Sequence, residues 1–231
     1  IFSGTRGVGK TTIARILAKC LNCESDSKPT SQPCNKCSNT LEISAGRSVD
    51  FLEIDAASNT QVEKMRDLIE TVEYKPAKGR FKVYLIDEVH MLSGASFNAL
   101  LKTLEEPPPH VVFIFATTNP EKIPKTVQSR CLQLNLKTVS ENLLFDHLKN
   151  ILDKEKIDSD DTSVSLIVNS AQGSVRDALT LLDQAIAYGD GALNEVDVKN
   201  LLGTIDNSLL MSMIDNVIDG NGKKVFDLLS Q

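Results

Sequence analysis

Near its start the chain reads Gly4-Thr5-Arg6-Gly7-Val8-Gly9-Lys10-Thr11, which matches the phosphate-binding pattern G-x-x-x-x-G-K-[ST]. In this pattern the glycines let backbone N–H groups turn inward onto phosphate oxygens, and the lysine reaches the β- and γ-phosphates. The hydroxyl of Thr11 can bind Mg²⁺. The residues that we predict to bind a nucleotide are Gly4, Thr5, Arg6, Gly7, Val8, Gly9, Lys10, Thr11 and Thr12.

The residues around this loop have the context that the pattern requires, which is a strand before it and a helix after it. Ile1-Phe2 reads as the end of a strand, and residues 12–21 repeat apolar side chains at helical spacing. This apolar stripe consists of Ile13, Ile16, Leu17, Cys20 and Leu21. A chance glycine-rich turn would not need this context, so nucleotide binding is the favoured interpretation.

Length, composition and charge limit the classes of protein that this chain can be. With 231 residues it can form one large domain or two modest ones, and its 41% hydrophobic content is ordinary for a globular protein. No apolar run approaches the ~20 residues of a membrane-spanning helix, so no membrane partner is predicted. The net charge of −6 excludes a protein that coats DNA broadly. Basic clusters at 75–82 and 122–130 are either local contacts or solvated surface.

Strand and helix patterns alternate over the first part of the chain. The predicted strands are 49–54, 81–86, 111–116 and 132–136, and the predicted helices between them are 61–73 and 96–105. Alternation of this kind predicts an α/β fold with a parallel sheet flanked by helices.

After residue 138 only helical patterns follow. Ser140 can cap the first of these helices. The predicted helices are 141–154, 162–171, 174–188, 195–202 and 207–218. We therefore predict a core at 1–138 with a cysteine-containing insert at 20–40, a small helical domain at 139–190, and the start of another helical unit at 191–231.

The strand at 81–86 runs into two adjacent carboxylates, Asp87 and Glu88. An acid at the end of a strand beside a phosphate loop is the second half of an ATP site. We predict that Asp87 holds Mg²⁺ and that Glu88 orients or deprotonates the attacking water. The alternative is a strand that runs into a polar turn, and the phosphate loop makes it the weaker interpretation.

Other polar residues have two interpretations each on spacing alone. Ala116-Thr117-Thr118-Asn119, at the end of a strand, offers a side chain to the γ-phosphate or simply forms a turn before Pro120. Arg130 and Arg176 can neutralise charge on a transferred phosphoryl group or form surface salt bridges. His90 completes a D-E-x-H sequence that invites comparison with helicases, and we expect it to pack at the mouth of the sheet.

Cys20-x-x-Cys23 and Cys34-x-x-Cys37 have the spacing of a four-thiolate zinc site, which indicates a reducing, cytoplasmic compartment. Cys20 also lies on the apolar stripe, so it is either a fourth ligand or a buried core cysteine. The predicted zinc ligands are therefore Cys23, Cys34 and Cys37, with the fourth uncertain. Cys131 enters a strand, and we expect it in the core.

The motifs together resemble the γ/τ subunit family of bacterial DNA polymerase III, the ATPases of the sliding-clamp loader in the AAA+ class. The resemblance covers nearly all 231 residues. Its most specific segments are the cysteine insert, residues 52–58, Asp87-Glu88-Val89-His90-Met91-Leu92, Leu104-Glu105-Glu106-Pro107-Pro108 and Ser129-Arg130-Cys131. It implies a P-loop ATPase core, a helical lid and the start of a helical collar.

The resemblance also implies roles that spacing cannot supply. Thr118 corresponds to the sensor-1 position, Arg130 resembles the finger that reaches the ATP of a neighbouring subunit, and Arg176 resembles sensor 2. Lys10, Asp87 and Glu88 complete the catalytic set, with ATP and Mg²⁺ as cofactors. The implied partners are the δ and δ′ subunits, further γ/τ copies, the β sliding clamp and primer–template DNA. In this family ATP binding opens the clamp and hydrolysis releases it closed on DNA.

Two departures from the family pattern stand out. Thr40 occupies the place of the last zinc cysteine, and a hydroxyl is a poor zinc ligand. The chain opens on Ile1 without a methionine and ends without a closing signal, so we expect a fragment that lacks the extreme N-terminus and most of the collar. The alternative functions are a helicase or branch-migration ATPase and a nucleotide-binding scaffold that does not hydrolyse ATP. Intact Lys10, Thr11, Asp87 and Glu88 argue against the scaffold.

Overall fold

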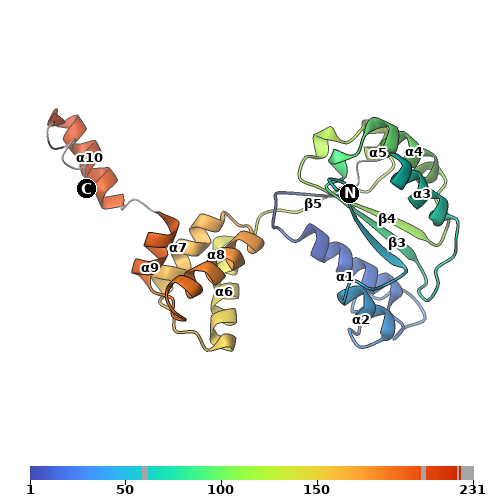
Figure 1. The fold of residues 1–231 in the computed structure, drawn as a ribbon, viewed down its shortest axis with the longest axis horizontal. Coiled ribbons are helices and arrows are strands. Elements are labelled where there is room, and N and C mark those ends of the chain that lie inside the picture. The colour runs from blue at the N-terminus through green and yellow to red at the C-terminus, as the bar shows by residue number, and fades with distance from the viewer. Residues whose placement is uncertain (59–61, 204–206, 223, 225–231) are drawn as a thin grey trace. The chain divides into compact units, whose positions relative to one another are not determined.

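The computed structural model describes residues 1–58, 62–203, 207–222 and 224, which form two compact units (Figure 1). The first unit contains residues 1–139 together with 174–176, and the second contains residues 140–173 and the described chain from 177 onward.

The first unit is built on a parallel sheet of five strands in the described chain, in the order β2-β3-β4-β1-β5. The strands are β1 (Phe2–Ser3), β2 (Phe51–Asp55), β3 (Lys82–Asp87), β4 (Val111–Thr117) and β5 (Leu134–Asn135). The predicted α/β fold with a parallel sheet is therefore confirmed. The last strand is shorter than the predicted 132–136, and it is an edge strand whose two residues are exposed.

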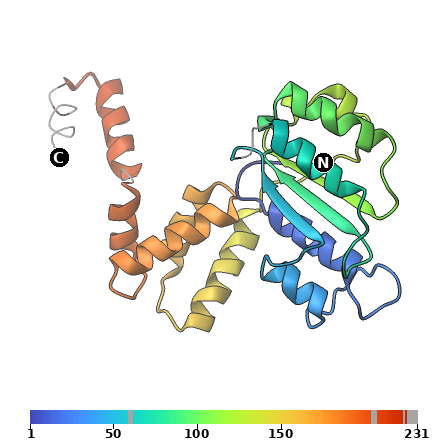
Figure 2. The same cartoon turned by 45° about the vertical axis from the view of Figure 1, so that its right-hand side comes forward.

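Helices cover both faces of this sheet (Figure 2). They are α1 (Lys10–Asn22), α2 (Ser38–Ser44), α3 (Val62–Val72), α4 (Gly94–Glu105) and α5 (Lys125–Gln128), with short 3₁₀ turns η1 (Val89–Met91) and η2 (Pro120–Lys122). The predicted helix at 61–73 corresponds to α3, and its first predicted residue, Gln61, lies outside the described residues. The predicted helix at 96–105 begins two residues earlier, where the Ser93 hydroxyl accepts a hydrogen bond from the Ser96 N–H.

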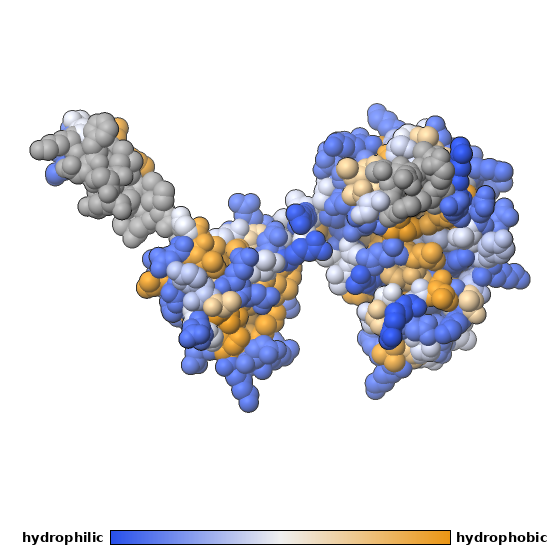
Figure 3. Space-filling model, in the orientation of Figure 1, coloured by the Kyte–Doolittle hydropathy of each residue, from blue (hydrophilic) through white to orange (hydrophobic). Residues whose placement is uncertain are grey.

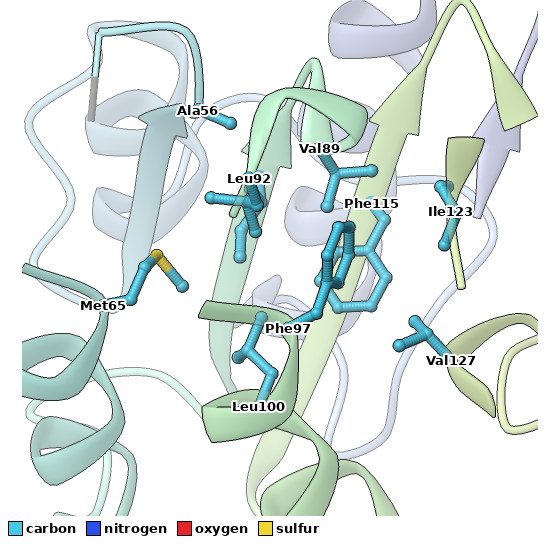
Figure 4. Close-up of a cluster of buried hydrophobic side chains, with 10 residues drawn as sticks. Ala56, Met65, Val89, Leu92, Phe97, Leu100, Phe115, Ile123 and Val127 are labelled. Carbon is cyan, nitrogen blue, oxygen red and sulfur yellow. The ribbon is translucent and has the colours of Figure 1, made fainter. Parts of the chain in front are cut away.

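The side chains of β3 alternate between the two faces, as a strand requires. Val83 and Leu85 pack beneath α1 and α2, whereas Ile86 packs on the opposite face against α3, α4 and α5. The core on that opposite face includes Phe97 and Phe115 (Figure 4). Cys131 packs against the same core, as predicted, and burial raises the pKa of its thiol. A strand buried on both faces explains why the sequence there is apolar without alternation.

The buried side of α1 differs from the predicted apolar stripe. Ala14 and Ala18 are fully buried against the sheet, while Ile16 and Leu17 are 47% and 37% exposed. Small side chains let this helix approach the strands closely, so burial follows distance from the sheet rather than hydrophobicity. Cys20 is only partly buried, so the prediction of a buried core cysteine at this position is not met.

The second unit is helical over its described residues. Its helices are α6 (Glu141–Glu155), α7 (Asp161–Ala171), α8 (Val175–Tyr188), α9 (Glu195–Leu202) and α10 (Asn207–Ile218). Ser140 precedes α6 as predicted, but its side chain makes no capping hydrogen bond. The caps with hydrogen-bonded side chains are Asp160 before α7 and Asn194 before α9.

On the face drawn in Figure 3, hydrophilic side chains lie mostly around the outside of each unit, and hydrophobic side chains form patches nearer its middle. Among the helices of the described chain, none combines the length and the apolar character that a membrane crossing would require.

Replacing Ala18 with Leu should destabilise the isolated chain by about 1–3 kcal/mol, because three added carbons have no room between α1 and the sheet. The matched control is Ile16→Ala on the exposed side of the same helix, which should change stability by less than about 0.5 kcal/mol. Urea unfolding followed by circular dichroism measures both. Equal effects of the two changes would contradict the assigned packing face.

Candidate nucleotide site and cysteine cluster

All three glycines of the phosphate loop between β1 and α1 have positive φ, so the path of the backbone favours glycine there. Gly4 has φ +151°, and a Cβ there would lie 2.5 Å from the carbonyl oxygen of Leu136. Gly9 precedes α1 with φ +93°, a left-handed conformation that a side chain disfavours. Within the predicted loop, Val8 is buried, whereas Thr5, Arg6 and Thr12 are exposed. The glycines of the motif therefore allow the backbone conformation of the loop, whether or not a ligand is bound.

Lys10 is buried at the first turn of α1, where its side chain folds back onto the loop. Its Nζ donates hydrogen bonds to the carbonyl oxygens of Gly4 and Thr5, both at 2.9 Å. Burial lowers the pKa of the Lys10 ammonium, while the carboxylates of Glu88 and Asp87 act to raise it. An arriving phosphate would thus meet a cation that is already held at the loop.

Thr11 and Asp87 meet, as the sequence predicted for a shared Mg²⁺ site. The Thr11 hydroxyl donates to Asp87 Oδ2 at 2.9 Å, and Asp87 Oδ1 accepts from the Glu88 N–H at 2.9 Å. A hydroxyl and a carboxylate side by side are oxygen donors of the kind that Mg²⁺ prefers, so the residues fit the ion. The contact joins the start of α1 to the end of β3.

Glu88 lies just beyond β3 in a left-handed backbone conformation, with φ +46° and ψ +43°. A non-glycine residue in this region carries a cost of about 1–3 kcal/mol, and such residues gather at functional sites. Glu88 Oε2 accepts hydrogen bonds from the hydroxyl of Thr118 at 3.1 Å and from its N–H at 3.4 Å. The structure therefore brings together the predicted base and the predicted sensor at the ends of β3 and β4.

His90 has a polar role that sequence reasoning missed. Its Nδ1 lies 2.9 Å from the hydroxyl of Thr117 and 3.3 Å from Glu88 Oε2, and its side chain is only 9% exposed. The packing at the mouth of the sheet was predicted, but the contact with the glutamate was not. The D-E-x-H spacing was the available signal.

The two predicted arginines lie differently relative to this set of contacts. Arg130 donates to Glu105 Oε1 at 2.7 Å and to the carbonyl oxygen of Thr126 at 2.6 Å, on the surface of the first unit. Arg176 lies in the first turn of α8 but belongs to the first unit, where its backbone N–H lies 3.4 Å from the carbonyl oxygen of Gly7 in the phosphate loop. Its positive charge acts to lower the pKa of Lys10. The catalytic roles of both arginines stay predictions.

Cys23, Cys34 and Cys37 converge, with their sulfur atoms all within 4.8 Å of one another. Backbone N–H groups point at these sulfurs, since Cys34 N donates to Cys23 Sγ at 3.3 Å and Cys37 N donates to Cys34 Sγ at 3.3 Å. The Cys34 N–H and the Ser25 hydroxyl lower the pKa of Cys23 to about 6. Burial raises the pKa of Cys37, but hydrogen bonds from Thr40 outweigh it and the pKa lies below its ordinary value.

Thr40 takes the fourth position of this cluster, and Cys20 does not belong to it. The Thr40 side chain is buried, and its Oγ1 lies 3.2 Å from Cys37 Sγ and 3.9 Å from Cys34 Sγ. Three convergent thiols, of which Cys23 and Cys37 have lowered pKa values, fit a thiophilic ion such as Zn²⁺, although the fourth donor is only a neutral hydroxyl. Cys20, which the sequence offered as a possible fourth zinc ligand, therefore does not fill that position.

Arg80 braces the cysteine insert, which sequence reasoning did not foresee. Its guanidinium donates to the carbonyl oxygens of Leu21 at 3.1 Å, Cys23 at 2.5 Å, Asp26 at 2.8 Å and Lys28 at 3.3 Å. This arginine belongs to the basic cluster at 75–82, so its positive charge serves the fold rather than a nucleic acid.

Comparison with known proteins identifies relatives of both units. Residues 1–140 match the family described as "DNA polymerase III, delta subunit", and residues 144–191 match "DNA polymerase III clamp loader subunit, ATPase lid domain". The whole chain is 54% identical to DNA polymerase III subunit tau of Escherichia coli (strain K12), of which it covers 36%. It is 52% identical over its whole length to DNA polymerase III subunit gamma of Buchnera aphidicola subsp. Acyrthosiphon pisum, of which it covers 63%. The chain thus spans only part of these relatives.

Among solved structures, the chain is similar to the RuvB Holliday junction branch migration motor of Thermotoga maritima. The TM-score is 0.60 at 16% identity, with 94% of this chain and 67% of that chain covered. A likeness at this identity shows a shared fold and nothing about a shared activity.

Proposed function

The chain belongs to the DNA polymerase III clamp-loader subunit family, and we propose that it is the ATP-hydrolysing part of a bacterial gamma/tau subunit. The observation that carries this proposal is the contact of Thr11 with Asp87, where the phosphate loop meets the acidic end of β3. In this role ATP binding opens a sliding clamp, and hydrolysis leaves the clamp closed on primer–template DNA. Residues 139–190 serve as the lid of the ATP site, and residues 191–231 begin a collar.

The side chains of the site divide the work of phosphoryl transfer among them. Lys10 and the N–H groups of the loop bind the phosphates, and Thr11 and Asp87 hold Mg²⁺. Mg²⁺, when bound, neutralises charge on the phosphate oxygens. Glu88 accepts the proton of the attacking water, and Thr118 fixes the direction of that carboxylate. Each role uses a contact or a charge that these residues already have.

The proposal extends to other chains. Arg130 supplies positive charge to the ATP of a neighbouring subunit, which is compatible with its surface position and with its side-chain contacts to Glu105 and Thr126. Arg176 senses the γ-phosphate in its own subunit. The ring partners are delta, delta prime and further gamma/tau copies, and the complex acts in the cytoplasm on the β clamp.

A second proposal concerns the cysteine insert, which we infer to bind Zn²⁺ through Cys23, Cys34 and Cys37. Zinc would supply a crosslink between the three thiolates, in addition to the hydrogen bonds from Arg80 that hold this loop. With Thr40 at the fourth position, binding should be weaker than at a four-thiolate site.

Replacing Glu88 with Gln should leave ATP binding intact and lower turnover by at least about 10²-fold, because an amide cannot accept the proton of the water. The measurement is ATP turnover by the full-length subunit assembled with its partners, clamp and primed DNA. Glu121→Gln, at an exposed position of η2, is the control. Undiminished turnover would remove Glu88 as the base, and absence of turnover by the unmodified complex would overturn the ATPase proposal.

Replacing Arg130 with Ala should leave the ATP affinity of the isolated chain unchanged and lower turnover of the assembled complex by about 10³-fold or more, as for other arginine fingers. Equilibrium binding of a fluorescent nucleotide and steady-state turnover give the two quantities. Arg47→Ala, at another exposed arginine, is the control. A large loss of affinity in the isolated chain would contradict action across a subunit boundary.

Replacing Thr40 with Cys should raise zinc affinity by more than about tenfold, since a thiolate replaces a neutral hydroxyl. Competition with a chromophoric chelator measures the affinity, and Thr40→Val is the control that adds no ligand. Zinc affinity of the unmodified chain should fall as the pH is lowered, because protons compete with zinc for the three thiolates, and below about 6 the Cys23 thiolate is protonated as well. Absence of zinc from both the unmodified and the cysteine-substituted chain would rule out a zinc site.

A further inference from the structure

We propose that His90 is a positioning residue for Glu88. By holding Oε2 of the carboxylate, His90 leaves Oε1 to face the attacking water. The inference rests on the proposed ATPase function and adds a residue that its mechanism did not use. It starts from the three nitrogen and oxygen atoms that surround Glu88 Oε2: the hydroxyl and N–H of Thr118 at 3.1 and 3.4 Å, and His90 Nδ1 at 3.3 Å.

The chemistry of these contacts determines which nitrogen of His90 carries a proton. An Nδ1 without hydrogen would set a lone pair against the carboxylate oxygen at 3.3 Å, which is repulsive. An Nδ1–H is instead shared between Glu88 Oε2 and the hydroxyl oxygen of Thr117 at 2.9 Å. The geometry therefore favours a histidine that donates from Nδ1.

His90 is held rigidly, as a positioning residue must be. It is the middle residue of η1, and Val89 beside it is fully buried in the core against α3 and α4. The hydroxyl of Thr117, which is also fully buried, accepts a hydrogen bond from the Asn119 N–H at 3.0 Å. The imidazole thus connects the end of β3 to the end of β4 through atoms that have little freedom to move.

The consequence for Glu88 is a choice between its two carboxylate oxygens. Oε2 is occupied by Thr118 and His90, so Oε1 is the oxygen left to accept a proton from water. The Glu88 side chain is 33% exposed, and its hydrogen-bonding contacts with Thr118 and His90 act on this rotation. Without His90, Thr118 alone would hold the carboxylate, and a misplacement of about 1 Å can lower a rate by about 10²-fold.

The test compares His90→Asn with His90→Leu in the full-length subunit assembled with its partners. The Asn amide carries a donor at nearly the position of Nδ1, while Leu has the same shape without a donor. We expect His90→Asn to keep turnover within about threefold, and His90→Leu to lower kcat by about tenfold to a hundredfold. ATP affinity and the thermal unfolding temperature of both variants should match those of the unmodified protein.

A second measurement separates positioning from folding. In the Glu88→Gln background, His90→Leu should produce no further loss of turnover, because its effect passes through the carboxylate. Equal turnover by His90→Leu and the unmodified protein would overturn the inference, as would equal losses in the Asn and Leu variants. If the unmodified complex hydrolyses no ATP, the proposed function fails first, whereas a normal complex with an insensitive His90 overturns only this inference.

Discussion

A single hydrogen bond, from the Thr11 hydroxyl to the Asp87 carboxylate, closes the candidate site and depends on the whole sheet. The two residues are 76 positions apart, so only the fold brings them together. β1 pairs with β4 and β4 pairs with β3, all in parallel, which sets the C-terminal ends of these strands along one edge. The alanine residues of α1 let this helix pack closely against the sheet, and this packing determines where Thr11 lies.

The fold and most of the site could be predicted because each part has a local pattern. The phosphate loop is continuous in sequence, and the acids follow an apolar run that must be a buried strand. The buried face of α1 could not be predicted in the same way. Periodicity finds the largest apolar residues, such as Ile16, whereas packing selects the smallest ones where two backbones approach closely. The strand ends differ from the predicted ones by at most two residues for a similar reason, since pairing in the sheet decides them.

Arg80 and His90 were missed because of the nature of their partners. Arg80 binds four backbone carbonyls in a loop more than 50 residues earlier, and a carbonyl leaves no mark on the sequence. His90 meets Glu88 two residues away, but the contact requires the left-handed backbone of Glu88, which no residue type announces. Cys23 joins the sulfur cluster and Cys20 does not, because α1 ends at Asn22 and so contains Cys20 but not Cys23.

The charges of the site determine where a cation that accompanies the nucleotide is needed. Two cations, the Lys10 ammonium and the Arg176 guanidinium, act on one another together with the Asp87 and Glu88 carboxylates, so these charges nearly balance before a triphosphate arrives. Two unit charges ~4 Å apart at a partly exposed position interact by about 4 kcal/mol, which is comparable with the gain from a few hydrogen bonds. A divalent cation held by Thr11 and Asp87 would offset the repulsion between the Asp87 carboxylate and an incoming phosphate. The contact of Thr11 with Asp87 matters for that reason, since it holds two oxygen donors where the compensating charge is needed.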